Sequence, residues 1–441
     1  MNLKIETDSK SDGGRTNPAS RFKLGEIPRQ AGMLFSANTS SMVASFLATV
    51  VHVHYLEPVD RGRFVFAQTI IAIAGLFLEV GIFPAGARLL ALARDRADER
   101  QTLGALVLLG VLLGSTLAIF TAAAAYPIDL IFQTDVRWML VTAAAFAFFL
   151  PFQSLIQESG QGLNKIRLLS AFQFSTAILN LLAQLALAIA GILSPQSALI
   201  AYLSSIGVAS VGAIVQLKPS FSDKSQHIRA VLKEVRSYGF NVYLARITGT
   251  VSTRIDNLII PYFLTDLSLL ALYDFAQRIS TPIMTLSRSL AITRYRAFAS
   301  LTRVPERIGK WNAGLLIVAS ISLVAAGPFA LGLLFPKYSD AAPLLLPFAV
   351  WALFGGLFQP YHMFLASHGR GVEIRNIAIM ITVADIVGLL LVVPRWGIMG
   401  AAWVAAASFL LDYVLTLYYY DKFRRTLVSS KSGGQSESNV T

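Results

Sequence analysis

The feature that most constrains this chain is the length of its uncharged stretches. Four of them contain no Asp, Glu, Lys or Arg: residues 101–128, 138–157, 311–336 and 341–369. A fifth, from Leu168 to Leu217, is long enough for two membrane helices joined by a turn at Ser194, since about 20 apolar residues cross a bilayer. Closed β-barrels are excluded, because these runs are continuously apolar and too long for strands of alternating polarity.

The composition also indicates that lipid is the solvent. Hydrophobic residues make up 55% of the 441 residues and charged residues only 14%, whereas soluble proteins carry about 25% charged residues. The chain has no cysteine, which excludes disulfides, thiolate metal sites and cysteine nucleophiles. Residues 1–30 are polar and basic, so we do not expect a cleavable secretory leader.

We therefore expect an all-α polytopic membrane protein with about twelve transmembrane helices in two six-helix lobes. The expected spans are residues 31–53, 64–86, 103–125, 138–157, 168–192, 196–217, 241–264, 268–292, 311–335, 341–366, 376–394 and 398–420. The tail from Ser429 is rich in Ser, Gly and Asn, and we expect it to be disordered.

The positions of lysine and arginine independently test the number of spans and their orientation, because these residues accumulate in the cytoplasmic loops of bacterial inner-membrane proteins. With the N-terminus inside, most of the 37 Lys and Arg residues fall in cytoplasmic segments. The outer loops then hold only Arg61, Arg63, Arg137, Lys337 and Arg395. This alternation predicts an inner-membrane protein with both termini in the cytoplasm. Topology and contact with anionic lipid thus explain the net charge of +12, and we expect no binding to nucleic acid.

Short matches recur between the two halves of the chain. The Phe-Ala-Gln motif at 66–68 recurs at 275–277, and the Gly-x-Gly motif at 160–162 recurs at 369–371, both at the same offset. Each half starts inside and has an even number of spans, so we expect parallel repeats related by an axis along the membrane normal.

This pattern divides the chain into five parts. We expect a cytoplasmic N-terminal segment (1–30), an N-lobe (31–217), a cytoplasmic linker (218–240), a C-lobe (241–420) and a cytoplasmic disordered tail (421–441). The linker interleaves basic residues with Ile228, Val231 and Leu232, which fits either an interfacial amphipathic helix or a plain basic loop.

Ionisable residues within the spans are concentrated in two of them. Each costs roughly 2.5–3.5 kcal/mol in the membrane, so each needs a physical reason. The spans 241–264 and 268–292 hold Arg246, Arg254, Asp256, Asp274, Arg278 and Arg288. The other ten spans hold only Glu79, Asp385 and Asp412.

Helical spacing places two of these arginines at one depth. Arg254 lies about 15 Å from the outer end of its helix and Arg278 about 15 Å from the outer start of the next, so both lie near the midplane. Paired guanidinium groups suit phosphate, which accepts paired N–H bonds. The candidate substrate-binding residues are these two with Arg246, Thr250 and Asn257, which share a face with Arg254, and Asn38 of the polar first span.

The same charges also fit internal ion pairing, since Asp274 and Arg278 are four residues apart and could satisfy each other. The candidates for coupling transport to a cation, H⁺ or Na⁺, are Asp256, Asp274, Glu79 and His362. Glu79 could instead pair with an arginine. His362 follows Pro360, which should kink its helix, and could instead be a neutral hydrogen-bonding residue.

Motifs of catalysis are missing from the sequence. It has no Walker sequence, no His-Glu-x-x-His and no metal-ligand cluster. We therefore expect no catalytic residue, no resident metal and no cofactor apart from a coupling cation.

The segment RIDNLIIPYFL at 254–264, followed by LYDFAQR at 272–278, resembles polysaccharide biosynthesis proteins of the Wzx type. In that family a helix ending in R-x-D is followed by a helix with G-x-Y-x-x-A; here the glycine before Tyr273 is absent. The segment DRGRFVFAQ at 60–68 stands in the corresponding place of the first half. The family belongs to the multidrug/oligosaccharidyl-lipid/polysaccharide (MOP) exporter superfamily, whose members have two helical lobes and include the MATE transporters.

The resemblance implies a flippase that moves a polyprenyl-pyrophosphate-linked oligosaccharide to the outer leaflet by alternating access, for O-antigen or exopolysaccharide synthesis. Its partners would be that lipid-linked oligosaccharide, membrane lipids, a polysaccharide polymerase and a chain-length regulator. One alternative is a cation-coupled multidrug or metabolite antiporter of the same superfamily. Another is a membrane polysaccharide polymerase, which the short outer loops disfavour.

Overall fold

The computed structural model describes residues 26–437, and within them the secondary structure is helical. Eight helices precede the linker: α1 (Glu26–Tyr55), α2 (Pro58–Glu79), α3 (Ile82–Ala91), α4 (Arg96–Phe132), α5 (Arg137–Ala147), α6 (Leu150–Gly162), α7 (Ile166–Ile189) and α8 (Pro195–Leu217). The linker forms α9 (Lys224–Glu234) and the π-helix η2 (Val235–Gly239). The elements that follow are α10 (Phe240–Ser252), α11 (Asp256–Phe263), α12 (Leu267–Thr293), α13 (Tyr295–Phe298), α14 (Glu306–Leu334), the 3₁₀-helix η3 (Pro336–Leu344), α15 (Leu345–Leu357), α16 (Gln359–Ser367) and α17 (Gly371–Glu437).

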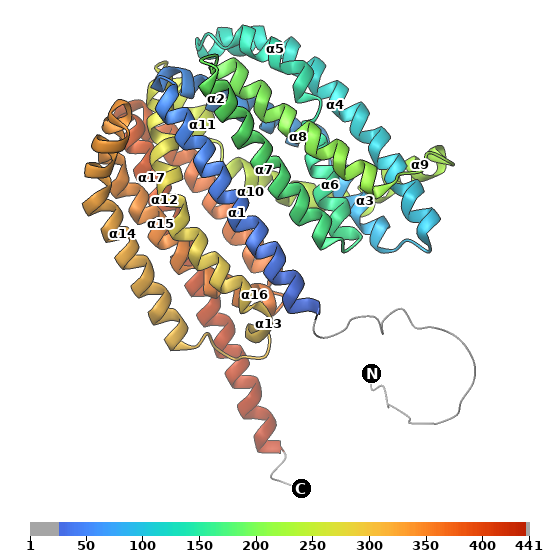
Figure 1. The fold of residues 1–441 in the computed structure, drawn as a ribbon. Helices are drawn as coiled ribbons and strands as arrows, with labels where there is room; N and C mark the ends of the chain where they lie inside the picture. Colours follow the sequence, from blue (N-terminus) through green and yellow to red (C-terminus); the bar gives the residue numbers. More distant parts are fainter. Residues whose placement is uncertain (1–25, 438–441) are drawn as a thin grey trace.

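These helices confirm the two-lobed, all-α membrane architecture. The N-lobe contains α1–α8 and the C-lobe α10–α17 (Figure 1). Helix α1 packs along α7 in the N-lobe, and α2 packs against α12 across the lobes. Both ends of the described chain lie on the same side of the molecule, and the lobes meet at the opposite side, which we call the closed end (Figure 1).

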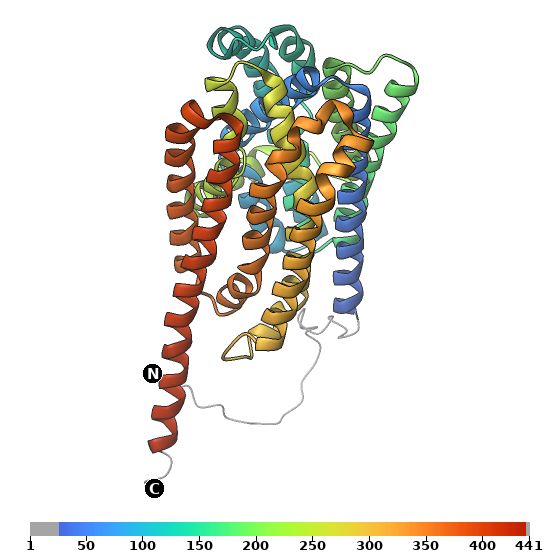
Figure 2. The ribbon, with the colours of Figure 1, turned by 90° about the vertical axis from the view of Figure 1, so that its left-hand side faces the viewer.

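The number of apolar helices fits about twelve crossings. Within residues 26–437, eight helical stretches are long and apolar enough to span a membrane. One of them, in α17, is a pair of antiparallel limbs joined at Gly397, where φ is +57° (Figure 2). The long helix α1, the charged helix α12 and the broken pair α10–α11 supply the remaining crossings.

Four expected spans are corrected, because the structure divides each into two helices. The second span (64–86) is interrupted at Val80 and Gly81, both with positive φ. The fourth span (138–157) is interrupted near Phe148. The seventh span (241–264) is interrupted between Ser252 and Asp256. The tenth breaks at Phe358 before Pro360, which confirms the predicted kink.

A continuous apolar core joins the lobes at the closed end. It contains aromatic and aliphatic side chains of α2, α11, α12 and η3, among them Phe66, Phe275 and Tyr338. The backbones come close here: a Cβ added to Gly62 of α2 would lie 1.9 Å from the carbonyl oxygen of Leu267 of α12. Only glycine allows this approach, so α2 and α12 pack tightly at the closed end.

The linker is helical and lies against the N-lobe. Val231 is fully buried in the core formed by α3, α4, α6 and α8. Glu234 pairs with Arg88 of α3, and the Nε2 atom of His227 lies 3.1 Å from Asp98 of α4. Helix α17 continues to Glu437, through most of the tail where the sequence predicts disorder, because extending an existing helix is easier than starting one. Residues 1–25, most of the expected N-terminal segment, lie outside the described residues.

Candidate functional site

A polar cavity of about 450 Å³ lies between the lobes; we call it the central cavity. Side chains from α1, α2, α7 and α8 form one wall, and side chains from the break before α11, from α11 and from α12 form the other. The lining residues are Ser45, Ala48, Thr49, His52, Arg61, Phe64, Gln68, Asn180, Tyr202, Thr253, Arg254, Asn257, Asp274, Gln277 and Arg278. Amides, hydroxyls and guanidinium groups dominate this surface, so it is suited to a hydrophilic, hydrogen-bonding solute.

Two arginines of the central cavity share one carboxylate. The Nε atom of Arg278 donates to both oxygens of Asp274, at 3.0 and 2.8 Å, which is the pairing within α12 that the spacing allows. Arg61 of α2 pairs with the same carboxylate from the other lobe. One negative charge thus stands against two positive charges.

Arg254 lies in the break of the seventh span and lines the central cavity. The backbone is tightly wound here: the N–H of Arg254 donates to Val251 and that of Asn257 to Arg254, both three residues back. Such a tight turn within a span often marks a hinge. Among the described carboxylates none forms an ion pair with Arg254, whose guanidinium is therefore available to a ligand.

Summing these charges gives the central cavity an excess of two positive charges, with His52 counted as neutral. The contributors are Arg61, Arg254 and Arg278 against Asp274. Inside a membrane such an excess is costly unless an anion or water compensates it. The arrangement therefore favours a doubly charged anion.

Arg246 and Thr250 face a different, smaller cavity of about 180 Å³, which shares Tyr202 and Arg254 with the central cavity; we call it the side cavity. Arg246 donates to Glu79 of α2 at 2.9 Å and to Glu158 of α6 at 3.4 Å. It also donates to the Ser154 hydroxyl at 3.1 Å. Arg246 is thus flanked by two carboxylates, and Glu79 is paired with an arginine.

Asp256 and His362 lie in a third cavity, of about 400 Å³, within the C-lobe; we call it the C-lobe cavity. Asp385 and Asp412 also line it, and Thr253 and Gln277 line both it and the central cavity. The Tyr273 hydroxyl donates to Asp256 at 2.9 Å, and the Ser408 hydroxyl to Asp385 at 2.8 Å. Across residues 26–437, no three His, Asp or Glu side chains converge closely enough to form a metal site.

The two asparagines named from the sequence lie in different places. Asn257 lines the central cavity, and its amide donates to Thr69 of α2 at 3.3 Å. Asn38 is exposed on α1 and is not among the residues that line the central cavity.

Arg61 does not lie in an outer loop, where the sequence places it. It lies in the first turn of α2, which begins at Pro58, and it is only 1% exposed. A periodic signal could have found it, because Arg61, Phe64 and Gln68 follow helical spacing and all line the central cavity. His52 also lines the central cavity, although no sequence pattern indicates it. Its ring packs against Phe64 with centroids 4.7 Å apart.

Comparison with family models matches residues 27–288 to the family described as polysaccharide biosynthesis protein. The match covers more than half of the chain, from α1 to most of α12, and so includes the lining of the central cavity. No curated protein sequence gives a match.

Several solved structures of membrane transporters and a flippase have the same fold. The lipid II flippase MurJ in an inward closed conformation superposes with a TM-score of 0.72 at 12% identity, covering 88% of this chain and 87% of that one. An inward-facing multidrug resistance MATE transporter gives 0.69 at 14% identity, covering 88% and 96%. An outward-facing MATE transporter gives 0.59 at 16% identity, covering 91% and 96%. The likeness is one of fold, and it is greater for the inward conformations.

Proposed function

Since this chain belongs to the polysaccharide biosynthesis protein family, we propose that it carries a polyprenyl-pyrophosphate-linked oligosaccharide across the bacterial inner membrane for O-antigen or exopolysaccharide synthesis. The observation that supports this most strongly is the excess of two positive charges in the central cavity. A pyrophosphate that links a lipid to a sugar carries about two negative charges. The fixed cations lower the barrier for this headgroup in a region of low dielectric constant, while the polyprenyl tail remains in lipid.

Each part of the cavity has a role in this proposal. Arg254 and Arg278 bind the pyrophosphate through paired N–H groups. The amides of Gln68, Asn180 and Gln277 donate to and accept from sugar hydroxyls. With cytoplasmic termini, the closed end faces outward and the cavity loads from the cytoplasm, in keeping with the likeness to an inward-facing MATE transporter. A polymerase and a chain-length regulator then act on the delivered unit.

The second candidate is a cation-coupled drug or metabolite antiporter. The carboxylates Asp256, Asp385 and Asp412 of the C-lobe cavity favour cation coupling, in which Asp274, Glu79 and His362 are further candidates. The central cavity argues against cationic drugs as substrates, because its excess positive charge repels them. Cation coupling is compatible with the flippase, so we propose that H⁺ or Na⁺ at the C-lobe cavity drives it.

The test is export by cells in which this chain is the sole flippase for one surface glycan. Arg254→Ala and Arg278→Ala should each reduce export at normal membrane abundance, because each removes a cation that faces the pyrophosphate. Arg→Lys should restore export only in part, since an ammonium keeps the charge and loses the paired geometry. Arg395→Ala, at an exposed arginine outside the cavities, is the matched control. Normal export by both alanine variants would refute the proposed role of these arginines.

A further inference from the structure

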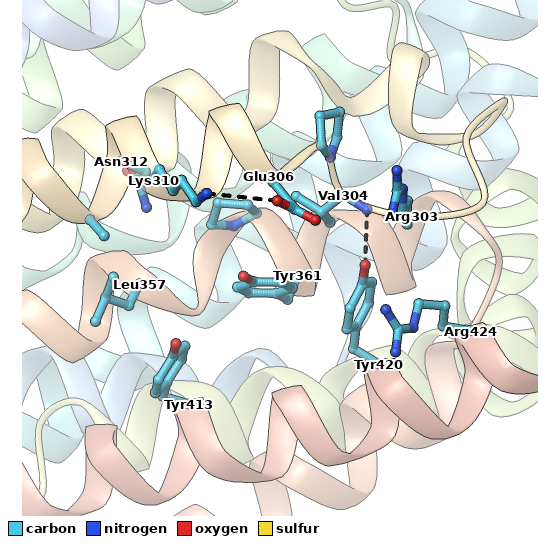
Figure 3. A pocket seen from close by; sticks show the side chains of 14 residues that line it. Arg303, Val304, Glu306, Lys310, Asn312, Leu357, Tyr361, Tyr413, Tyr420 and Arg424 are labelled. Atoms are coloured by element: carbon cyan, nitrogen blue, oxygen red, sulfur yellow. Dashed lines mark hydrogen bonds and ion pairs between the residues drawn. The ribbon is translucent and has the colours of Figure 1, made fainter.

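A pocket of about 400 Å³ opens near the end of the C-lobe closest to the termini, away from the transport cavities. It lies between the start of α14, helix α16 and the last part of α17; we call it the basal pocket (Figure 3). None of its lining residues lines the central, side or C-lobe cavity. The proposed transport mechanism therefore leaves it without a role.

Arg303 and Arg424 lie at one end of the basal pocket, and Lys310 lies nearer its middle, beside Asn312 (Figure 3). These three cations line the pocket against a single acidic residue, Glu306 (Figure 3). Glu306 is held only loosely, 3.7 Å from Lys310, and both side chains are exposed. Arg424 shares Asp421 with Arg425, whereas Arg303 forms no ion pair with any described carboxylate. This end of the pocket is suited to an anion.

The other end of the basal pocket carries no charge. Asn312, Ala313, Leu357 and Tyr413 line it. On α17 the distance from Arg424 to Tyr413 is about 16 Å at 1.5 Å per residue. The pocket thus changes from cationic to neutral along the helix axes, toward the interior of the membrane. A phospholipid has the same order, with its phosphate at the surface and its acyl chains below.

Exposed aromatic and aliphatic residues place the basal pocket at headgroup depth. Trp311, one residue beyond Lys310, is 71% exposed, and tryptophan is enriched at the membrane–water boundary. In line with Lys310 on α14, Ile317 and Ile321 are exposed, an apolar stripe suited to acyl chains. A free phosphate has no acyl chains and would make no contact with these apolar residues.

Tyrosines hold the walls of the basal pocket in place. The Tyr420 hydroxyl accepts a hydrogen bond from the N–H of Val304 at 2.9 Å, which fixes the loop that carries Arg303 (Figure 3). The rings of Tyr361 and Tyr420 meet edge to face with centroids 5.0 Å apart. The cationic end is therefore preorganised, which lowers the entropic cost of binding.

We propose that the basal pocket binds the phosphate headgroup of an anionic phospholipid, with the acyl chains lying along α14. Arg303 is the main contact to the phosphate, and Lys310 and Arg424 add to the attraction. The lipid fills a space between α14, α16 and α17 and so stabilises the C-lobe. This binding does not depend on the transported substrate.

The test uses the full-length protein in neutral detergent and follows its thermal unfolding midpoint. Phosphatidylglycerol, phosphatidylcholine and inorganic phosphate are titrated separately. We expect phosphatidylglycerol to raise the midpoint and the other two to leave it unchanged. Arg303→Ala should weaken the apparent affinity for phosphatidylglycerol roughly fivefold, as expected for one cation near an anionic surface. Arg303 is exposed and forms no ion pair with a described carboxylate, so its replacement leaves the fold intact.

Arg307→Ala is the matched control, because Arg307 is exposed on the first turn of α14 and does not line the pocket. An equal weakening by Arg303→Ala and Arg307→Ala would overturn the proposal in favour of diffuse attraction. Equal shifts with the two lipids would overturn it too, and a shift with inorganic phosphate would replace the lipid with a free anion. Transport plays no part in this assay, so its outcome is independent of the export test.

Discussion

Arg61 and Asp274 are 213 residues apart in the sequence and form a buried ion pair that joins the lobes at the closed end. The same carboxylate accepts from Arg278 in the central cavity. An anion that binds Arg278 therefore competes with Asp274 and changes the electrostatic environment of the pair that joins the lobes. In the proposed mechanism, anion binding in the cavity and opening of the closed end therefore both involve the Asp274 carboxylate.

The Arg61–Asp274 pair should contribute strongly to stability. Arg61→Gln leaves Asp274 with one partner fewer in a buried setting, and breaking a buried pair costs about 3–5 kcal/mol. We expect a clearly lower unfolding midpoint in detergent. Arg63→Gln is the control, since Arg63 is partly exposed and pairs with Asp60 and Asp135 at 3.2 Å, which is worth about 0–1 kcal/mol. Equal midpoints for the two variants would contradict the prediction.

Gly62 should be required for close packing of α2 on α12. In Gly62→Ala the new methyl group would meet the Leu267 carbonyl, so the helices must separate. We expect the closed end to open more readily, measured as faster labelling of a cysteine placed near Lys337. Gly212→Ala is the matched control, because a Cβ there has no neighbour within 4 Å, and the change should be neutral or stabilise α8 by about 0.5–1 kcal/mol. Unchanged labelling in Gly62→Ala would show that the contact tolerates a methyl group.

Arg246 and Glu79 should be coupled in stability. Arg246→Ala leaves the buried Glu79 and the partly buried Glu158 without their cation, so we expect a loss of stability of about 3 kcal/mol or more. Adding Glu79→Gln should recover part of this loss, because one of the stranded charges is removed. A double-mutant cycle of thermal unfolding measures the coupling. Additive effects of the two changes would mean that the 2.9 Å contact carries little energy.

The orientation can be tested with single cysteines, because the chain has none of its own. Lys224→Cys and Arg307→Cys should react with an impermeant thiol reagent only after the inner membrane is opened, since these exposed positions are expected in the cytoplasm. Lys337→Cys and Arg395→Cys should react in intact spheroplasts. Labelling of Lys224→Cys in intact spheroplasts would refute the cytoplasmic linker.

The sequence predicts the helical architecture well, because each crossing needs a long apolar run that is visible locally. The local sequence does not predict the breaks near Val80 and at residues 253–255. No proline stands there, and tertiary packing sets the backbone. The kink before Pro360 is predicted, because proline removes a backbone hydrogen bond.

The candidate site is predicted less completely, because its charges are defined by partners far away in the sequence. Helical spacing finds the pairing of Asp274 with Arg278, which is local to α12. Helical spacing can place Arg61 on the same helix face as Phe64 and Gln68, but it cannot show that Arg61 pairs with Asp274 or that Glu158 is a second partner of Arg246. These contacts join different helices. A count of charges in loops assigns Arg61 to the outer surface, because the count cannot show its buried partner Asp274.

The break at residues 253–255 brings the cavities of the two lobes together at one turn of the backbone. Thr253 faces the central and C-lobe cavities, and Arg254 faces the central and side cavities, so three compartments meet at one short turn. Asp256 is only two residues beyond Arg254. A cation that neutralises Asp256 acts on the same few peptide units that carry the guanidinium, and by reciprocity an anion held by Arg254 alters the affinity for that cation. If a cation does couple to transport as proposed, this turn would link its binding at Asp256 to the position of the Arg254 guanidinium that holds the headgroup.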